Sequence, residues 1–188
     1  MDKILEYAEI VEKMEEQGIE FLPGLKIEQI ALIEHTFGVN FPAELRLFYE
    51  TALPVSKKFY DWTDLSEENQ NKIRKQLSFP VRSVSKALNI DLPWPASWGE
   101  KPEDEDDVEE KAAKILSEAT ALIPLYGHRY LACVEGEACP VLSIYGGDII
   151  YYGNSLSNWL QVEFLGQSRK TIFETEPARV PGWDVLIS

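Results

Sequence analysis

Apolar residues recur at three- and four-residue steps through the first quarter of the chain, which is typical of amphipathic helices. We predict a helix over Lys3 to Gln17, a second over Ile27 to Phe37 and a third that begins at Phe41-Pro42. Gly18 and Gly38 follow the first two, because glycine readily adopts the left-handed conformation that ends a helix. The residues expected on the three inner faces are Ile4, Ala8, Val11 and Met14, then Ile27, Ile30, Ile33 and Phe37, then Leu45, Phe48, Tyr49 and Ala52.

The apolar pattern is less regular over residues 55–88. Val55 to Trp62 is compatible with a short strand, and Ser66 is a good N-cap because acidic residues follow it in the first turn. We expect the helix after Ser66 to end near Leu77, where Phe79-Pro80 interrupts the pattern. A second short helix is then predicted around Val81, Val84 and Leu88.

A loop and an acidic helix follow. The prolines and tryptophans of Leu92 to Pro102 are incompatible with regular structure, so the tryptophans either fix this loop to the body or face a partner. Eight of the eleven residues from Glu100 to Glu110 are acidic. We predict a helix from about Asp107 to Thr120, whose dipole gives part of the acidic run a purely structural role. Its inner face would consist of Val108, Ala112, Ile115, Leu116 and Ala119.

The run from Leu122 to Leu165 is the richest in strand-forming residues. Gly146-Gly147 lies between two such runs and predicts a two-residue hairpin turn that pairs Tyr145 with Asp148. Because side chains alternate between faces, the hairpin has one apolar face and one mixed face that we expect to be half exposed. The apolar face holds Leu142, Ile144, Ile149 and Tyr151, and the mixed face holds Val141, Ser143, Tyr145, Asp148, Ile150 and Tyr152.

A preceding strand is predicted over Leu125 to Cys133, joined to the hairpin by the loop Val134 to Ala138. A loop of five residues sets Cys133 opposite Cys139 and Tyr130 opposite Leu142. His128 and Tyr130 then face the core, and Arg129 joins Ser143 on the mixed face. After the hairpin, Ser155 caps a last helix that ends at Gly166, and Ile172-Phe173 and Trp183 to Ile187 are expected as short extended pieces.

These elements predict an α+β fold, with a mainly antiparallel sheet flanked by helices in a single domain over residues 1–188. The net charge of −14 makes nucleic acid and anionic membrane surfaces poor partners. The N-terminus lacks the uninterrupted apolar segment of a signal peptide, and no apolar run approaches the roughly 20 residues of a membrane span. We therefore expect a soluble cytoplasmic protein.

Catalytic and metal sites find little support in the sequence. His128 and Cys133 are five residues apart on one predicted strand, so they would lie on opposite faces and cannot form a nucleophilic pair. The two cysteines and two histidines lack the spacing of a zinc site, and Val108 and Glu109 break a calcium-loop pattern. We predict no cofactor, no metal and no enzymatic activity.

The pair His128-Arg129 is the strongest candidate for a specific polar role. In the structural interpretation Arg129 bridges to Asp148 across the mixed face and fixes the strand register. In the functional interpretation Arg129, Tyr145, Asp148 and Tyr152 form a binding centre, because Tyr and Arg often carry interface energy.

Several strings resemble one known family. LIPLYGHRYL followed by PVLSIYGGDIIYYGNSLSNWLQVEF resembles the C-terminal signature of the SUKH superfamily, the Smi/Knr-type cell-wall synthesis regulators and bacterial immunity proteins. FPAELRLFY resembles its early helix motif, and DWTDLSEENQNKIRKQLSFP and LPWPASWGEKP resemble one bacterial branch. The resemblance covers about residues 28–165, leaving the N-terminal helix and the C-terminal tail as extensions. It implies an α+β fold and protein binding without established catalysis.

This resemblance and the negative charge together suggest an immunity-type protein that neutralises a cognate toxin by covering its active surface. The expected partner is a basic toxin domain such as a nuclease, which an acidic surface would attract. The alternative is a regulatory or scaffold protein in cell-wall or signalling control, and a metal-dependent hydrolase is a third hypothesis. Besides the mixed-face residues, the predicted partner-binding residues are Trp94, Trp98, Glu103, Asp104, Asp106 and Asp107.

Overall fold

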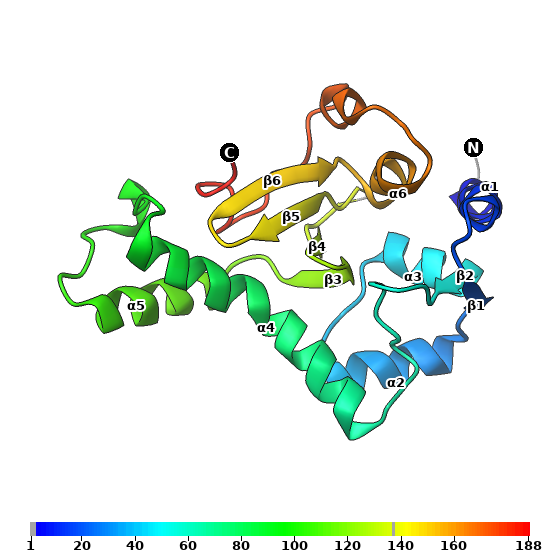
Figure 1. Ribbon diagram of the computed structural model, residues 1–188, viewed down its shortest axis with the longest axis horizontal. Helices are drawn as coiled ribbons and strands as arrows, with labels where there is room; N and C mark the ends of the chain where they lie inside the picture. Colours follow the sequence, from blue (N-terminus) through cyan, green and yellow to red (C-terminus); the bar gives the residue numbers. More distant parts are fainter. Residues whose placement is uncertain (1–2, 137) are drawn as a thin grey trace.

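The computed structural model describes residues 3–136 and 138–188 and has the predicted α+β architecture (Figure 1). Helices and two antiparallel sheets alternate in blocks along the chain. The elements are α1 (Lys3–Glu16), β1 (Phe21–Pro23), α2 (Ile27–Phe37), α3 (Ala43–Thr51), β2 (Ala52–Pro54), α4 (Glu67–Ile90), η1 (Ala96–Trp98), α5 (Glu105–Ser117), β3 (Leu122–Tyr126), β4 (Arg129–Ala132), β5 (Val141–Tyr145), β6 (Asp148–Gly153), α6 (Leu156–Phe164) and η2 (Arg169–Phe173).

The main sheet is an antiparallel meander in the order β3-β4-β5-β6. The predicted register is confirmed, because Tyr145 pairs with Asp148 across the β5–β6 turn and Tyr130 pairs with Leu142. The single strand predicted over residues 125–133 is wrong. Tyr126 pairs with Arg129 across a tight turn whose Gly127 has a φ of 54°, so two strands stand where one was expected.

Because of this turn, His128 does not have the position that was predicted for it. A core position was expected for its side chain on the basis of strand alternation, but His128 lies in the turn and is exposed. The other alternation assignments on β4 and β5 hold, since Tyr130 and Leu142 are both buried on one face and Arg129 contacts Ser143 on the other.

Both faces of the sheet are covered by separate hydrophobic cores. One core lies against α1, α2, α3 and α6 and receives Leu131 and Val141 from the sheet. The other lies against α4, α5 and the C-terminal tail and receives Tyr130 and Leu142. The mixed face is therefore half exposed only in part: Val141 and Ser143 are buried, Ile150 and Tyr152 are half-buried, and Tyr145 and Asp148 beside the β5–β6 turn are exposed.

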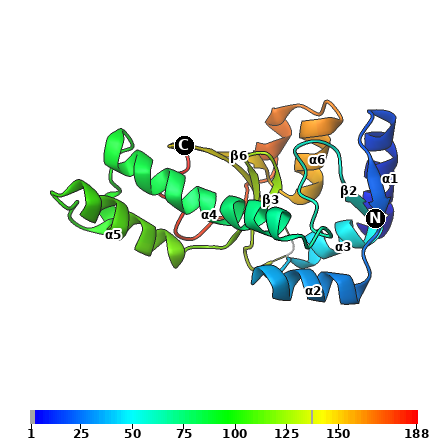
Figure 2. The same cartoon turned by 60° about the horizontal axis from the view of Figure 1, so that its bottom comes forward.

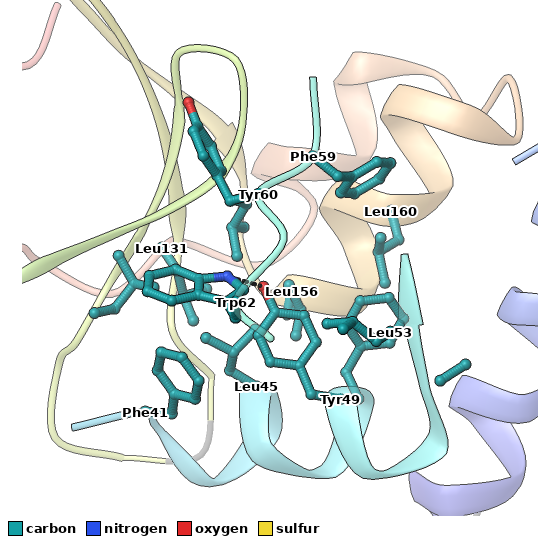
Figure 3. Packing of buried hydrophobic residues seen from close by; sticks show 14 of the residues in the cluster. Phe41, Leu45, Tyr49, Leu53, Phe59, Tyr60, Trp62, Leu131, Leu156 and Leu160 are labelled. Atoms are coloured by element: carbon teal, nitrogen blue, oxygen red, sulfur yellow. Dashed lines mark hydrogen bonds between the residues drawn. The ribbon is translucent and has the colours of Figure 1, made fainter. Parts of the chain in front are cut away.

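Trp62 lies in the middle of the first core (Figure 3). Its side chain is fully buried and packs edge-to-face on Phe37 and Phe41, with ring centroids 5.3 and 5.1 Å away. The indole N–H donates to the hydroxyl of Tyr49 over 3.2 Å, so the polar atom is satisfied inside an apolar cluster. The segment predicted as a strand over residues 55–62 is instead a loop that carries Trp62 inward, and the strand β2 precedes it.

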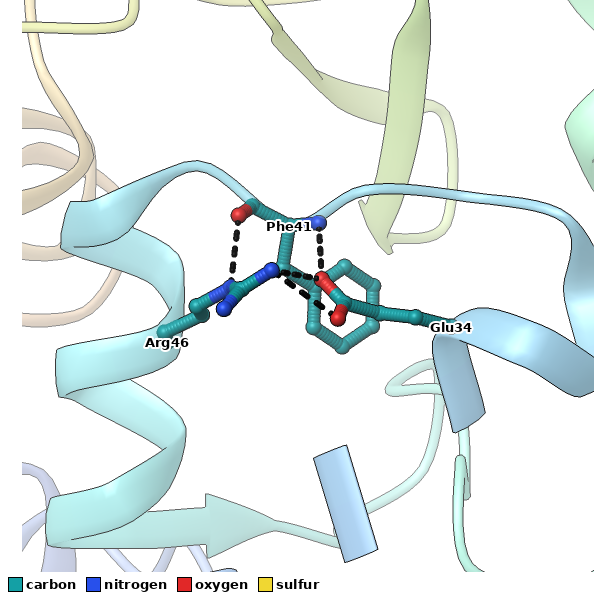
Figure 4. Close-up of polar contacts among 3 residues, drawn as sticks. All are labelled: Glu34, Phe41 and Arg46. Carbon is teal, nitrogen blue, oxygen red and sulfur yellow. Dashed lines mark hydrogen bonds and ion pairs between the residues drawn. The ribbon is translucent and has the colours of Figure 1, made fainter. Parts of the chain in front are cut away.

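A polar clamp fixes the corner between α2 and α3 (Figure 4). The Glu34 carboxylate accepts from the backbone N–H of Phe41 at 2.6 Å and from Arg46 Nη2 at 2.7 and 2.9 Å. Arg46 Nε in turn donates to the Phe41 carbonyl at 3.0 Å. Phe41 and Arg46, at the two ends of the string FPAELR, therefore have a structural role at this corner.

Helix α4 is continuous, which contradicts the predicted break at Phe79-Pro80. Pro80 lies inside the helix, where its missing N–H and its ring disturb the hydrogen-bond ladder. The side chains of Ser78 and Arg82 donate to the Lys75 carbonyl, each over 3.2 Å. The helix passes from the first core, where Ile73 is buried, to the second core, where Val84 and Leu88 are buried (Figures 1 and 2).

Smaller differences concern helix faces and ends. Helix α5 begins at Glu105, two residues before the predicted start, and the tail forms η2 and turns rather than extended pieces. Ile4, Ala8 and Ile27 are exposed although inner positions were predicted for them, whereas Tyr7 and Ile10 are buried. None of the described helices combines the length and the apolar character needed to cross a bilayer.

Candidate functional site

Arg129 lies between the sheet and α6. Its Nε donates to the Glu163 carboxylate at 3.0 Å, its Nη1 donates to Ser143 Oγ at 2.9 Å, and its guanidinium carbon lies 3.7 Å from the centre of the Tyr152 ring. The residue is only 9% exposed. The predicted bridge from Arg129 to Asp148 is wrong, because α6 covers this face and supplies Glu163 as the carboxylate partner.

The exposed part of the mixed face is the end near the two tight turns. Tyr145 is 71% exposed, Asp148 is exposed, and the His128 ring contacts Tyr145 edge-to-face at 5.9 Å. Partial burial and the nearby charges of Arg129 and Lys58 lower the pKa of His128, against the opposing effect of Glu163 and Asp148. The imidazole is therefore mainly neutral at pH 7 and offers a hydrogen-bond donor and an acceptor.

Two further cations border this region, and neither was predicted. Arg169, an exposed residue of η2, lies over the Tyr152 ring at 4.7 Å, so the ring has contacts with two guanidinium groups. Lys58 lies over the Tyr126 ring at 5.3 Å. Glu163, Arg169 and Lys58 come from segments distant in sequence, and no local motif singles them out.

The acidic residues named in the sequence lie around the start of α5. Asp104 is the N-cap, and its carboxylate accepts from the Asp106 N–H at 2.9 Å. All four carboxylates of the predicted set are exposed, and none forms an ion pair with another described residue. The nearby Lys111 and Lys101 donate to the carbonyls of Glu100 and Leu88 instead. The set consists of Glu103, Asp104, Asp106 and Asp107.

The two tryptophans fix the loop before α5 and also remain half-exposed. Trp94 and Trp98 pack edge-to-face at 5.5 Å, and the Trp94 indole donates to the Gly99 carbonyl at 2.9 Å. Lys111 lies over the Trp94 ring at 5.4 Å. Both alternatives left open by the sequence are thus partly met, since each ring packs on the protein and keeps an accessible part.

The structure places the two groups of predicted residues at one side of the molecule. A Cβ built on Gly147, in the β5–β6 turn, would lie 3.4 Å from side chains of Ala87 and Leu92. Leu92 begins the loop that carries Trp94 and Trp98, so the turn holding Tyr145 and Asp148 meets the base of this loop (Figure 1). Arg129 and Tyr152 differ from the rest, because they contact each other and residues of α6 and η2, Glu163 and Arg169.

A separate apolar cleft of about 470 Å³ lies between α2, α4, α5 and β3. Leu77, Pro80, Leu116, Cys133 and Trp183 are among the residues that line it, and none of the predicted binding residues does. Among the described residues no three His, Cys, Asp or Glu side chains are arranged to hold a metal ion.

Comparisons with known proteins do not assign the chain to a family. No family model matches it, and neither a curated protein nor a solved structure matches it at a significant level. The fold and the candidate site define an acidic α+β protein with an exposed aromatic and acidic surface.

Proposed function

We propose that the chain is a non-catalytic protein-binding module of the SUKH immunity type, which neutralises a cognate toxin in the cytoplasm by covering its active surface. The observation that supports this most directly is the exposed acidic start of α5, which has no cationic partner among the described side chains. Trp94 and Trp98 lie beside it as aromatic anchors, the residue type that most often dominates binding energy.

The expected partner is a basic domain, and a nuclease is the class we favour because its substrate-binding surface is positive. A net charge of −14 speeds association with such a surface and makes binding weaken as salt rises. The exposed Tyr145 and Asp148 extend the surface from the α5 end towards the sheet, and Arg129 donates to Ser143 on the strand that carries Tyr145.

The test is co-purification with the product of the neighbouring reading frame, followed by titration calorimetry. The variant Glu103→Gln/Asp107→Asn removes two charges from the α5 end, and Glu9→Gln/Glu12→Gln removes two from exposed positions on α1. We expect the α5 variant to weaken binding at least tenfold and the α1 variant less than threefold. Equal losses would indicate non-specific attraction, and the absence of a complex at low salt would refute the proposal.

The regulatory alternative predicts a different result in the same experiment. A scaffold protein in cell-wall or signalling control would bind a partner encoded elsewhere, and its affinity would change little between low and physiological salt. Cells that express the neighbouring product would then gain no protection from this chain.

A further inference from the structure

Cys133 and Cys139 lie two steps beyond Leu131 and Val141, the last paired residues of β4 and β5. Leu131 pairs with Val141, and the Ala132 N–H donates to the Pro140 carbonyl at 2.9 Å, so the same register places Cys133 opposite Cys139. Both cysteines are free. Five residues separate them in the sequence.

The hydrogen bonds show which kind of pair the cysteines form. The Cys133 N–H donates to the Ala121 carbonyl at 2.9 Å, beside β3, and the Cys139 N–H donates to the Glu44 carboxylate at 2.6 Å, on α3. Ala132 and Pro140 form a hydrogen-bonded pair, and hydrogen-bonded and non-hydrogen-bonded pairs alternate along an antiparallel ladder, so the continued register gives Cys133 and Cys139 a non-hydrogen-bonded position. Such pairs bring Cα atoms to about 4.5 Å, which lies within the range that a disulfide spans.

The two thiols also share a face and differ in access. Residues opposite each other in this register point to the same side of the sheet, as the contact between Arg129 and Ser143 shows four pairs away. Cys139 is buried in the first core. Cys133 packs on that core, is half-buried and lines the apolar cleft, so a small reagent in the cleft reaches Cys133 first.

We propose that Cys133 and Cys139 form a cross-strand dithiol that glutathione disulfide, or a small disulfide like it, converts to an intrachain disulfide. The Cys133 thiolate attacks one sulfur of the glutathione disulfide, forms a mixed disulfide and releases one glutathione thiolate. The Cys139 thiolate then attacks the Cys133 sulfur and releases the second glutathione. The protein loses two electrons and two protons, and the oxidant becomes two molecules of glutathione.

Thiol–disulfide exchange at this pair should be slow near neutral pH, because both thiols are hard to deprotonate. Burial raises the pKa of Cys133 to about 12, and burial together with Glu44 raises the pKa of Cys139 to about 11. Little thiolate is present at pH 7, so exchange is slow. The rate of disulfide formation therefore reflects the low thiolate fraction, whereas its equilibrium constant reflects how closely the fold holds the two thiols.

Oxidation would tie the β4–β5 connection into a closed ring against α3. The ring would span residues 133–139, and Cys139 already holds Glu44 through its backbone N–H. Closing a loop of this size restricts the unfolded chain more than the folded one, so we expect the melting temperature to rise by roughly 5 °C. This inference does not depend on the proposed function.

The test is a redox titration of the whole chain in glutathione buffers, with and without 8 M urea, approached from both the reduced and the oxidised protein. Acid quenching, alkylation and mass spectrometry count the thiols and identify the Cys133–Cys139 linkage. We expect the disulfide to form at least tenfold more readily in the folded protein than in urea. The variants Cys133→Ser and Cys139→Ser cannot form the intrachain disulfide and should give at most a mixed disulfide with glutathione, on the single remaining cysteine.

A ratio near one between the folded and the urea-denatured protein would overturn the proposal, because the fold would then not bring the thiols together. Mixed disulfides that persist on the folded wild-type chain would overturn it as well. Circular dichroism in each buffer verifies that the folded samples are folded, and native-state alkylation of Cys133→Ala confirms whether Cys139 stays protected.

Discussion

Arg129 shows how one buried charge connects elements that the sequence does not link. It is held by Glu163 on α6, Ser143 on β5 and the ring of Tyr152 on β6. Removing one partner from a buried ion pair leaves the other charge without compensation, which is costly in a low-dielectric environment. Glu163 therefore matters more for stability than its position in a short helix suggests.

We predict that Glu163→Gln lowers the free energy of unfolding by about 2 kcal/mol, since the amide keeps one acceptor but loses the charge. The matched control is Asp184→Asn, which makes the same change in the pair with Arg179, a side chain that is 84% exposed. An exposed pair contributes less than about 1 kcal/mol. Urea unfolding of both variants measures the difference, and equal effects would contradict the buried role of Arg129.

At the scale of elements, the junction between β6 and α6 depends on a glycine. A Cβ built on Gly153 would lie 2.6 Å from Trp159 Cβ and 2.9 Å from the Trp159 backbone nitrogen. The backbone cannot move away easily, because Ser155 caps α6 there by accepting from the Asn158 N–H. The close approach of strand and helix thus requires the absence of a side chain.

Gly153→Ala should accordingly destabilise the protein by at least about 2 kcal/mol through overpacking. Gly147→Ala serves as its control, because the added Cβ would make ordinary contacts at 3.4 Å with Ala87 and Leu92. We expect a loss below about 1 kcal/mol for the control. Thermal and urea unfolding compare the two, and a similar tolerance at both positions would show that β6 and α6 can separate without cost.

Elements whose pattern is local were predictable, and those set by distant contacts were not. The two-glycine turn and the strand alternation predict the β5–β6 register residue by residue. In contrast, Pro80 suggests a helix end, but α4 continues because its two halves pack on two different cores. Gly127 lies inside a run rich in strand-forming residues and has no second turn residue beside it, so its turn and the displacement of His128 could not be predicted from the pattern alone.

The candidate site follows the same division. Tyr145, Asp148 and the acidic start of α5 are exposed as predicted, because turn residues and charged first-turn residues carry their own surface signal. The partners of Arg129 and Tyr152 could not be predicted, since Glu163 and Arg169 reach them only after α6 and η2 fold over the sheet. The mixed face is covered through tertiary contacts of α6 and η2, and no local sequence pattern indicates these contacts.

At the scale of the whole molecule, the excess of negative charge lowers the stability of the folded state. The chain has 32 acidic and 18 basic residues, so at least 14 carboxylates have no cation of their own. Several of these lie together at the start of α5, where the helix dipole offsets only part of their repulsion. The folded state therefore brings like charges closer than the expanded chain does, and this repulsion lowers stability.

We predict that the melting temperature rises by a few degrees when sodium chloride increases from 10 to 150 mM, as the screening length falls from about 30 to about 8 Å. The variant Glu103→Gln/Asp107→Asn should reduce this gain, because it removes two of the clustered charges, whereas Glu9→Gln/Glu12→Gln on α1 should reduce it less. Differential scanning calorimetry at a series of salt concentrations gives the slope. A melting temperature that stays constant or falls over this range would mean that opposite charges already compensate the acidic surface, and the same surface would then have little long-range attraction for a basic partner.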